Sequence, residues 1–240
     1  MNTFVLVHGM YTGAWCWDKV IPLLQRAGHQ VIAFDLPGHG RDNTPISKIS
    51  LQSYVDKVCQ ILDSQSEPII LVGHSFGGIV ITQTAEYRPE KIKKLVYVCA
   101  FFPLNGDSSL KLVESTPNST PLASQYTIIS EDKSFHMVKE EGIKEMFYHD
   151  CSDKDITLAL PLLRPEPTIC HVTPVKTTAE NFGRIPRIYI QTLNDKALSS
   201  SFQEKMFSTM PFQKIIKMKT SHSPFFSVPD ELASHLSSLE

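Results

Sequence analysis

The segment Gly73-His74-Ser75-Phe76-Gly77 constrains the fold of this chain more than any other feature. It follows an apolar run at residues 68–72 that predicts a buried strand, and it precedes residues 78–85, which predict a helix. A G-x-S-x-G pattern in this context is typical of a sharp turn that lifts the serine hydroxyl clear of the sheet edge. The glycines are expected because a Cβ there would strike the neighbouring strand or helix. We therefore predict that Ser75 is a nucleophile beside the positive end of a helix, although a plain strand–turn–helix is the alternative.

The composition of the chain fits one larger α/β domain and argues against several classes of protein. Its 240 residues can bury a sizeable core, and 42% hydrophobic and 20% charged residues are ordinary globular values. A net charge of −2 gives no indication of a nucleic-acid or anionic-membrane partner. No apolar run approaches the roughly 18 residues of a membrane span, and the strand pattern at residues 4–7 leaves no room for a signal peptide. We expect a cytoplasmic protein that is a monomer or a homodimer.

The cysteines predict neither disulfides nor a metal centre. They are five, an odd number, and they lie far apart without a C-x-x-C motif or histidines at zinc-site spacing. Scattered cysteines of this kind are typical of reduced thiols in the cytosol. We therefore expect no metal and no cofactor. The five positions are Cys16, Cys59, Cys99, Cys151 and Cys170.

Short apolar runs alternate with amphipathic segments over much of the chain. Within residues 51–62, for example, Tyr54, Val58 and Leu62 recur at helical spacing. Strand–helix alternation of this kind predicts a mostly parallel, doubly wound sheet of about six strands with helices on both faces. The expected strands cover residues 3–8, 31–35, 69–73, 94–99, 187–191 and 214–218. The expected helices cover residues 17–27 and 51–62, follow the serine turn to about residue 87, and begin again near Pro229.

The alternation lapses between residues 103 and 184, where prolines are frequent. About 80 residues with so few core elements would be marginal as a separate domain, which is the alternative interpretation. We predict instead a single domain in which residues 1–102 and 185–240 form the core and residues 103–184 form a cap over the active site. Helical pieces of this cap are expected around residues 111–115, 133–148 and 153–163.

A serine hydroxyl is a weak nucleophile at neutral pH, so Ser75 needs a base, which in turn needs an orienting acid. In folds with this serine turn the chain order is serine, acid, histidine. Asp195 follows the strand expected at residues 187–191, and His222 follows the last strand. Both therefore emerge at the carboxyl edge of the sheet, beside the serine. We predict Asp195 as the acid and His222 as the base, with Asp107 as the alternative acid.

The other acidic and imidazole side chains are interpreted as structural. Of the nine histidines, only His222 follows the last strand at its carboxyl end. Three acidic residues look like surface charge of the cap, namely Asp150, Asp153 and Asp155. Five histidines in helical or cap sequence are read as structural, namely His29, His136, His149, His171 and His235.

The oxyanion that forms when Ser75 attacks a carbonyl needs two directed donors. One expected donor is the backbone N–H of Phe76, at the start of the helix after the serine. The other is the N–H of Met10, in the loop after the first strand, although His8-Gly9 can also be read as a simple strand-end turn. The expected substrate pocket is lined by Met10, Tyr11, Phe76, Phe101, Phe102 and Leu162, while Phe225 and Phe226 belong to the pocket or to the core.

These segments together resemble the α/β-hydrolase superfamily, and more narrowly the plant methylesterase and hydroxynitrile lyase group with related bacterial esterases. The narrower resemblance rests on FVLVHG at residues 4–9, GAWCW at 13–17, LLRP at 162–165, IYI at 188–190 and Asp195-Lys196. It implies an α/β-hydrolase fold in which Ser75, Asp195 and His222 form the triad. It also implies that Met10 and Phe76 supply the oxyanion donors.

Two positions distinguish esterases from lyases within that group. The lyases carry a lysine directly after the catalytic histidine, which holds cyanide, and a glutamate before the serine. Ser223 and His74 occupy these positions here. The resemblance therefore favours ester hydrolysis over cyanohydrin cleavage. The turn DLPGHG at residues 35–40 is common in the broader superfamily but not typical of the plant group, which leaves the plant group's substrates an open question for this chain.

The expected function is a cofactor-free serine carboxylesterase that acts on a small hydrophobic, aromatic or methyl ester through an acyl-enzyme. Lactones, thioesters and amides are alternative substrates, because the same triad serves all of them. A small-ligand receptor on this fold is a second class of function, since fold alone does not fix function. Hydroxynitrile lyase activity is a third, and a dehalogenase would need a carboxylate in place of Ser75.

Overall fold

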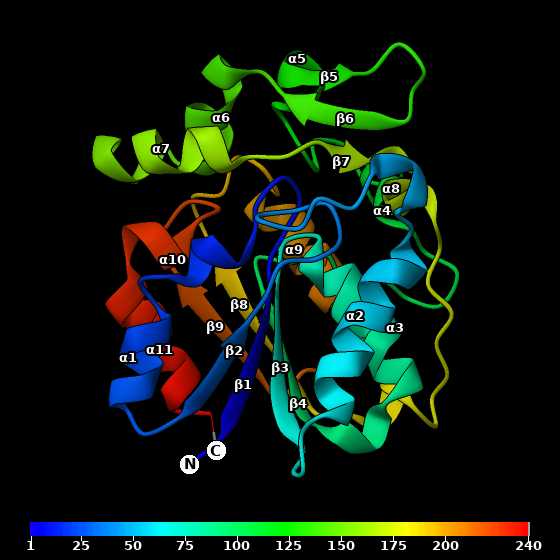
Figure 1. Ribbon diagram of the computed structural model, residues 1–240, viewed down its shortest axis with the longest axis vertical. Helices are drawn as coiled ribbons and strands as arrows, with labels where there is room; N and C mark the ends of the chain where they lie inside the picture. The colour runs from blue at the N-terminus through cyan, green and yellow to red at the C-terminus, as the bar shows by residue number, and fades with distance from the viewer. Residues whose placement is uncertain (240) are drawn as a thin grey trace.

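A six-stranded parallel sheet forms the centre of the protein, in the order β2-β1-β3-β4-β8-β9 (Figure 1). The computed structural model describes residues 1–239. The prediction of a mostly parallel sheet of about six strands is confirmed. The strands are β1 (Thr3–Val7), β2 (Gln30–Ala33), β3 (Ile69–His74), β4 (Ile92–Val98), β8 (Arg187–Thr192) and β9 (Lys214–Met218).

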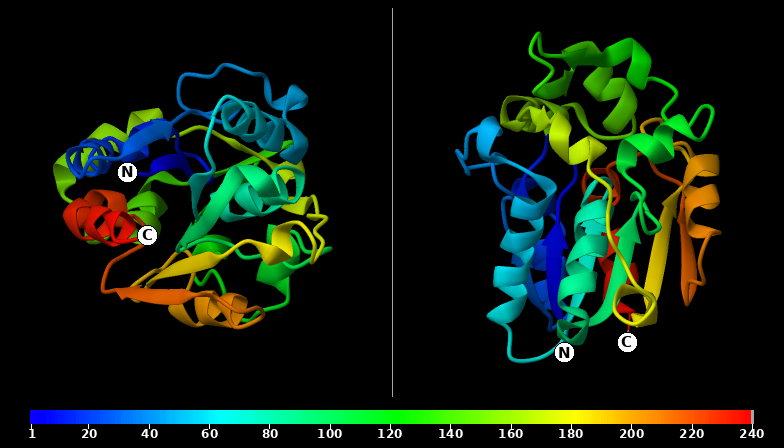
Figure 2. Two further views of the ribbon diagram at one scale, coloured as in Figure 1. Left: turned by 90° about the horizontal axis from the view of Figure 1, so that it is seen from below. Right: turned by 90° about the vertical axis from the view of Figure 1, so that its right-hand side faces the viewer.

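Side chains alternate between the two faces of the sheet and build a hydrophobic core on each. In β1, Val5 and Val7 join one core, while Phe4 and Leu6 join the other. The two views of Figure 2 show the helices distributed on both sides of the sheet. The first core is covered by α2 (Leu51–Asp63), α3 (Gly77–Tyr87) and α9 (Ser200–Phe207). The second is covered by α1 (Ile21–Arg26), α10 (Pro224–Ser227) and α11 (Pro229–Ser237).

The helix predicted over residues 17–27 is shorter than expected. Residues Ala14–Trp17 form the 3-10 helix η1, and α1 begins only at Ile21. Pro22 lies in the first turn of α1, where backbone N–H groups make no hydrogen bond within the helix, so its lack of an N–H costs nothing. Deeper in a helix its ring would clash with the preceding turn. The proline therefore fixes where α1 can begin. The remaining 3-10 helices are η2 (Ile46–Lys48), η3 (Pro89–Lys91), η4 (Leu160–Leu162) and η5 (Phe182–Arg184).

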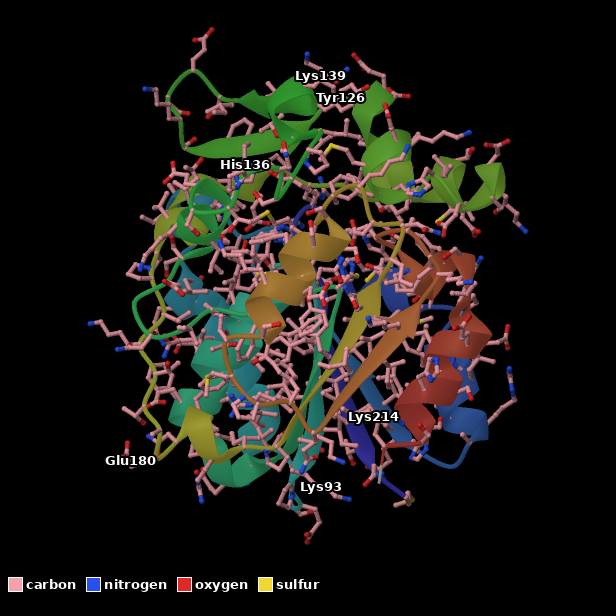
Figure 3. All side chains as sticks on the ribbon, turned by 180° about the vertical axis from the view of Figure 1, so that it is seen from behind. Lys93, Tyr126, His136, Lys139, Glu180 and Lys214 are labelled. Carbon is pink, nitrogen blue, oxygen red and sulfur yellow. The ribbon has the colours of Figure 1, made fainter. Side chains whose placement is uncertain are left out.

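Residues 103–184 lie mostly over the carboxyl ends of the strands and contain a small sheet of their own (Figure 1). This antiparallel sheet has the order β5-β6-β7, with β5 (Thr127–Ile129), β6 (Phe135–Val138) and β7 (Glu166–Pro167). Seen from behind in Figure 3, His136 and Lys139 mark this layer. The helices of the segment are α4 (Ser109–Glu114), α5 (Ala123–Tyr126), α6 (Glu140–Phe147), α7 (Asp153–Ala159) and α8 (Thr168–Val172).

The sequence pattern does not predict this small sheet. The helix expected over residues 133–148 begins only at Glu140, and residues 135–138 form β6 instead. Alternate residues of β6 are buried, and its pairing partners are 127–129 on one side and 166–167 on the other. The strand therefore depends on partners distant in sequence, which a local pattern does not reveal. Within residues 1–239, no helix is both long and apolar enough to cross a membrane.

A buried ion pair joins the segment over the sheet to the core. Glu166 of β7 lies 3.0 Å from His39 Nε2, and both side chains are 1% exposed. The Tyr54 hydroxyl donates to the second Glu166 oxygen at 3.2 Å. Burial alone would lower the pKa of His39 and raise that of Glu166, but the attraction between them outweighs it. The pKa of His39 is therefore raised and that of Glu166 is lowered.

Replacing Glu166 with glutamine should lower the free energy of unfolding by about 3–5 kcal/mol, because a buried pair loses one partner. Because folding raises the pKa of His39, the protonated imidazole contributes fully to the free energy of unfolding below pH 6.5, its ordinary pKa. This contribution is lost as the pH rises through the raised pKa. The lowered pKa of Glu166 makes its contribution lost as the pH falls through that lowered value. Urea unfolding should therefore give a larger difference between wild type and variant near pH 6 than near pH 9.

The matched control is Asp153→Asn, which breaks the exposed pair between Asp153 and Lys144. Solvent screens that pair, so its removal should leave the unfolding midpoint nearly unchanged at either pH. A Glu166→Gln variant as stable as Asp153→Asn would contradict a stabilising role for the buried pair.

Candidate active site

Ser75 lies in a strained turn between β3 and α3. Its φ of 52° is in the left-handed region, which non-glycine residues rarely adopt. The turn is held by hydrogen bonds from the Ser75 amide to Val98 O at 3.2 Å and from the Phe101 amide to Ser75 O at 3.0 Å. A Cβ at Gly73 would lie 2.7 Å from Gly77 O, so a side chain there would force the strand and the helix apart. The local sequence around the serine is therefore what lets β3 pass directly into α3.

Asp195, in the loop after β8, is fixed by a dense set of donors. The amides of Ala197 and Leu198 both donate to its Oδ1 at 2.8 Å. The Thr192 hydroxyl donates to Oδ2 at 2.8 Å, and Gln203 Nε2 does so at 3.1 Å. The carboxylate is buried, so these bonds hold it in one orientation.

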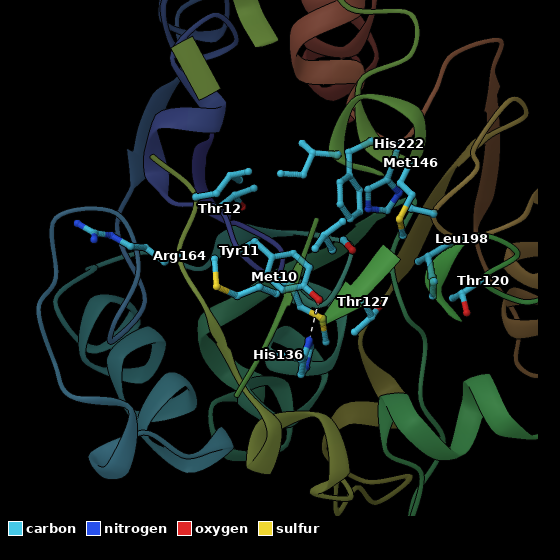
Figure 4. A pocket seen from close by; sticks show the side chains of 18 of the residues that line it. Met10, Tyr11, Thr12, Thr120, Thr127, His136, Met146, Arg164, Leu198 and His222 are labelled. Carbon is cyan, nitrogen blue, oxygen red and sulfur yellow. Dashed lines mark hydrogen bonds between the residues drawn. The ribbon is translucent and has the colours of Figure 1, made fainter. Parts of the chain in front are cut away.

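His222, in the loop after β9, completes the contact that the sequence predicts. Its Nδ1 lies 2.7 Å from Asp195 Oδ2, and the imidazole is 3% exposed. Because the carboxylate accepts, Nδ1 carries the hydrogen, which leaves Nε2 free to take a proton. Ser75 and His222 line the same cavity, in which Figure 4 labels His222. Within residues 1–239, the Ser75 hydroxyl makes no hydrogen bond, so the His222–Asp195 contact is the part of the predicted triad that is formed.

The backbone carbonyl of His222 is contacted by the side chains of His74 and Cys99. His74 Nε2 donates to the carbonyl oxygen of His222 at 2.8 Å, and Cys99 Sγ lies 3.3 Å from the same oxygen. Burial, together with the neighbouring His222, keeps the pKa of His74 well below its ordinary value, so this donor is neutral. One ligand atom from each of these three residues lies within 4.8 Å of the others, which is close enough for a metal ion. The three residues lie this close because His74 and Cys99 both contact the His222 carbonyl and the His222 ring contacts Asp195.

Asp150 also holds the loop after β9 that carries His222, which we call the histidine loop. The sequence did not predict this role. Its carboxylate accepts from the Ser221 amide at 2.7 Å, from the Thr220 hydroxyl at 2.9 Å and from the Ser221 hydroxyl. Burial alone would raise the pKa of Asp150, but these hydrogen bonds lower it below its ordinary value. The two residues that precede His222 are thus tied to the segment over the sheet. Asp107 instead pairs with Lys111 at 2.7 Å.

The two expected oxyanion donors have free amides. Within residues 1–239, neither the Met10 amide nor the Phe76 amide has a hydrogen-bond acceptor. Phe76 is the N-cap residue of α3, so its amide lies at the positive end of that helix. Met10 lines the cavity, whereas the Phe76 side chain packs edge-on against Tyr54 in the core. The Phe76 side chain is therefore not part of the pocket wall.

The cavity beside Ser75 has a volume of about 810 Å³. This is near the upper end of the roughly 300–1,000 Å³ typical of small-molecule sites. Its mostly apolar wall includes the predicted residues Tyr11 and Phe101, and also Phe225. Phe102 and Leu162 are not part of it. Phe102 packs against Tyr97 and Phe212 in the core, and Leu162 is 42% exposed to solvent.

Two histidines line this cavity, namely His136 and His171. From the sequence, both are interpreted as structural. His136 comes from β6, the strand that the sequence analysis missed, and its Nδ1 lies 2.7 Å from the Tyr11 hydroxyl (Figure 4). No local pattern could have placed them at the site, because their position depends on how the small sheet lies over the core. The alternating burial of residues 135–138 arises only when β6 pairs with β5 and β7.

The chain belongs to the α/β-hydrolase family, whose model matches residues 4–235. Methylesterase 2 of Arabidopsis thaliana is 35% identical over 246 residues, covering 97% of this chain and 94% of that protein. Five chloroplastic methylesterases of the same plant are 33–35% identical, and this chain spans 54–70% of their length.

Solved structures of related proteins are similar over nearly the whole chain. The Arabidopsis methylesterase MES16 has a TM-score of 0.86 at 27% identity, covering 98% of this chain and 97% of its own. A pyrethroid hydrolase from Sphingobium faniae JZ-2 has a TM-score of 0.89 at 28% identity, covering 98% and 96%. The predicted α/β-hydrolase resemblance, including its methylesterase branch, is confirmed.

Replacing Asp150 with alanine should lower kcat for ester hydrolysis on the order of 10- to 100-fold, because small displacements of a catalytic group have effects of this size. Steady-state kinetics with p-nitrophenyl butyrate measure the loss. The matched control is Asp153→Ala, an exposed aspartate three residues away, which should keep wild-type kcat. Equal kcat in the two variants would contradict a positioning role for Asp150.

Proposed function

We propose that this protein is a serine carboxylesterase that uses Ser75, His222 and Asp195 on esters with a hydrophobic acyl part. The observation that carries the proposal is the 2.7 Å contact between His222 Nδ1 and Asp195 Oδ2, beside a cavity that also contains Ser75. The coarser expectation of an ester-hydrolysing enzyme is confirmed by relatives named methylesterases and by the esterases among the similar structures.

In the proposed mechanism His222 Nε2 takes the proton of the Ser75 hydroxyl as its oxygen attacks the ester carbonyl. Asp195 keeps Nδ1 protonated and stabilises the imidazolium that forms. The same proton then passes to the departing alcohol, which leaves an acyl group on Ser75. Water, activated by His222, releases the acid and restores the hydroxyl.

The negative oxygen of the tetrahedral intermediate would lie between the Met10 and Phe76 amides. Both amides are without acceptors within residues 1–239, so they can donate without breaking an existing bond. One such donor contributes about 3 kcal/mol to transition-state stabilisation in related sites. The helix start at Phe76 adds its partial positive charge.

The cavity supports an ester whose acyl part is larger than acetate. Its wall is built from side chains such as Leu110, Ile143 and Met146, and its volume of about 810 Å³ exceeds the needs of a two-carbon acyl group. Methyl and aromatic esters both fit this description. The position that would need a lysine for cyanide chemistry is Ser223, which supports ester hydrolysis over a lyase reaction.

The Ser75→Ala variant should lose turnover of p-nitrophenyl butyrate by roughly 10⁴-fold or more, because the nucleophile is removed. The wild type should release a stoichiometric burst of p-nitrophenol and carry a butyryl group on Ser75, detectable by mass spectrometry of peptides.

The control for this experiment is Ser66→Ala, which alters an exposed serine that precedes β3, whereas Ser75 follows it, and which should behave as wild type. If the wild type shows neither turnover nor a burst, the esterase assignment is wrong and a ligand-binding role is favoured. Turnover that survives in Ser75→Ala would place the nucleophile elsewhere.

Lengthening the acyl group should raise kcat/KM from acetate through hexanoate by about two- to fourfold per methylene, because each buried CH₂ contributes about 0.8 kcal/mol. A p-nitrophenyl ester series measures this slope. Val138→Phe, which narrows the cavity, should move the optimum to shorter chains. A flat series would mean that the acyl group does not enter the cavity.

A further inference from the structure

One part of the cavity wall carries polar side chains that the proposed catalytic steps do not use. We call Tyr11, Ser109, His136, Thr168 and His171 the histidine cluster. All but Ser109 line the cavity, and Ser109 is buried behind His171. The rings of His136 and His171 are 5.5 Å apart, so the members form one group. In Figure 4, His136 lies against the Tyr11 hydroxyl, and His222 is labelled at another part of the cavity wall.

The Tyr11–His136 pair has one polar hydrogen more than it uses. A neutral imidazole and a phenol together carry two such hydrogens, and one of them lies in the 2.7 Å bond between the hydroxyl and Nδ1. Within residues 1–239, neither Tyr11 Oη nor His136 Nε2 has another partner. Whichever tautomer is present, the pair therefore keeps one unused donor.

The His171–Ser109 pair keeps one unused acceptor. Ser109 Oγ lies 2.6 Å from His171 Nδ1 and 3.1 Å from the His171 carbonyl oxygen. A carbonyl only accepts, so the hydroxyl donates to it and accepts from Nδ1–H. His171 Nε2 then carries a lone pair, and no other residue of the described chain donates to it.

The cluster is uncharged and incompletely satisfied. Burial lowers the pKa of His136, and burial together with His136 lowers the pKa of His171 to about 4, so both imidazoles are neutral at pH 7. His136 is 8% exposed, and both its Nε2 and Thr168 Oγ1 are buried without a partner among residues 1–239. Buried polar atoms without partners are uncommon, and the two residues that carry these atoms line the cavity.

The backbone of Tyr11 is held in a conformation that fixes its side chain. Its φ is 65°, in the left-handed region, and its carbonyl accepts from the Arg164 amide at 2.8 Å. Backbone strain of this kind persists where surrounding contacts impose it, often at ligand sites. The residue after the proposed oxyanion donor Met10 is thus committed to the histidine cluster.

We propose that the histidine cluster binds a hydroxyl group on the acyl part of the substrate, which makes this protein an esterase of hydroxy-esters. A hydroxyl accepts one hydrogen bond and donates another, so it complements the free donor of Tyr11–His136 and the free acceptor of His171. A keto oxygen would use only the donor, and a carboxylate placed at the cluster would lose its hydration and find two neutral imidazoles there. This inference rests on the proposed esterase function.

The test compares methyl ω-hydroxyalkanoates with unsubstituted methyl alkanoates of the same length, from six to twelve carbons. The ratio of their kcat/KM values should peak at the length that brings the hydroxyl to the cluster, by about tenfold over the shortest ester, as a hydrogen bond of ordinary strength would give. In Tyr11→Phe and His171→Phe the peak should disappear. Because the ratio is taken within each variant, loss of folded protein cancels.

The matched control is Tyr126→Phe, which removes a tyrosine hydroxyl bonded to Glu145 outside the cavity and should keep the peak. A flat ratio in the wild type, or a peak that survives in Tyr11→Phe, would overturn the inference while ester hydrolysis itself stands.

A second measurement separates this inference from the proposed function. Calorimetry with the Ser75→Ala variant over the same length series should give tighter binding of at least one ω-hydroxy ester than of its unsubstituted partner. If no ester is hydrolysed by the wild type but this binding preference is found, the catalytic assignment fails and the hydroxyl site stands. Equal affinities would overturn the hydroxyl site.

Discussion

The left-handed conformation of Ser75 is the constraint on which the site depends. A non-glycine residue held there costs on the order of 1–3 kcal/mol, which the surrounding structure must offset. The amides of Phe101 and Gly78 both donate to the Ser75 carbonyl at 3.0 Å, and β3 is buried along its whole length. The turn in consequence presents the hydroxyl to the cavity and leaves the Phe76 amide at the start of α3.

The segment over the sheet is part of the site and not only its cover. Asp150 fixes the two residues before His222, and the Arg164 amide fixes the carbonyl of Tyr11. The buried pair of Glu166 with His39 ties the same segment to the core. These contacts make the orientation of the histidine loop depend on residues that lie far from it in sequence. The orientation of His222 and the packing of the segment are coupled for that reason.

The parts of the molecule that the sequence predicted share a local physical cause. The parallel sheet follows from apolar runs such as residues 69–72, and the serine turn follows from glycines at fixed offsets. Asp195 and His222 lie together because parallel strands bring their carboxyl ends to one edge. The failures lie where tertiary packing decides. Phe102 faces the core and Leu162 faces solvent, although both are apolar residues near the site.

By itself the sequence determined the α/β-hydrolase framework, because hydrophobic periodicity and turn chemistry act over a few residues. It also determined which side chains stand at the ends of β3, β8 and β9. Only the tertiary structure decided that His136 and His171 line the cavity and that Asp150 holds the histidine loop. Those contacts join residues far apart in the sequence: Asp150 and Thr220 are 70 residues apart, and Tyr11 and His136 are 125 residues apart. Their geometry comes from packing one layer on another, which no local pattern encodes.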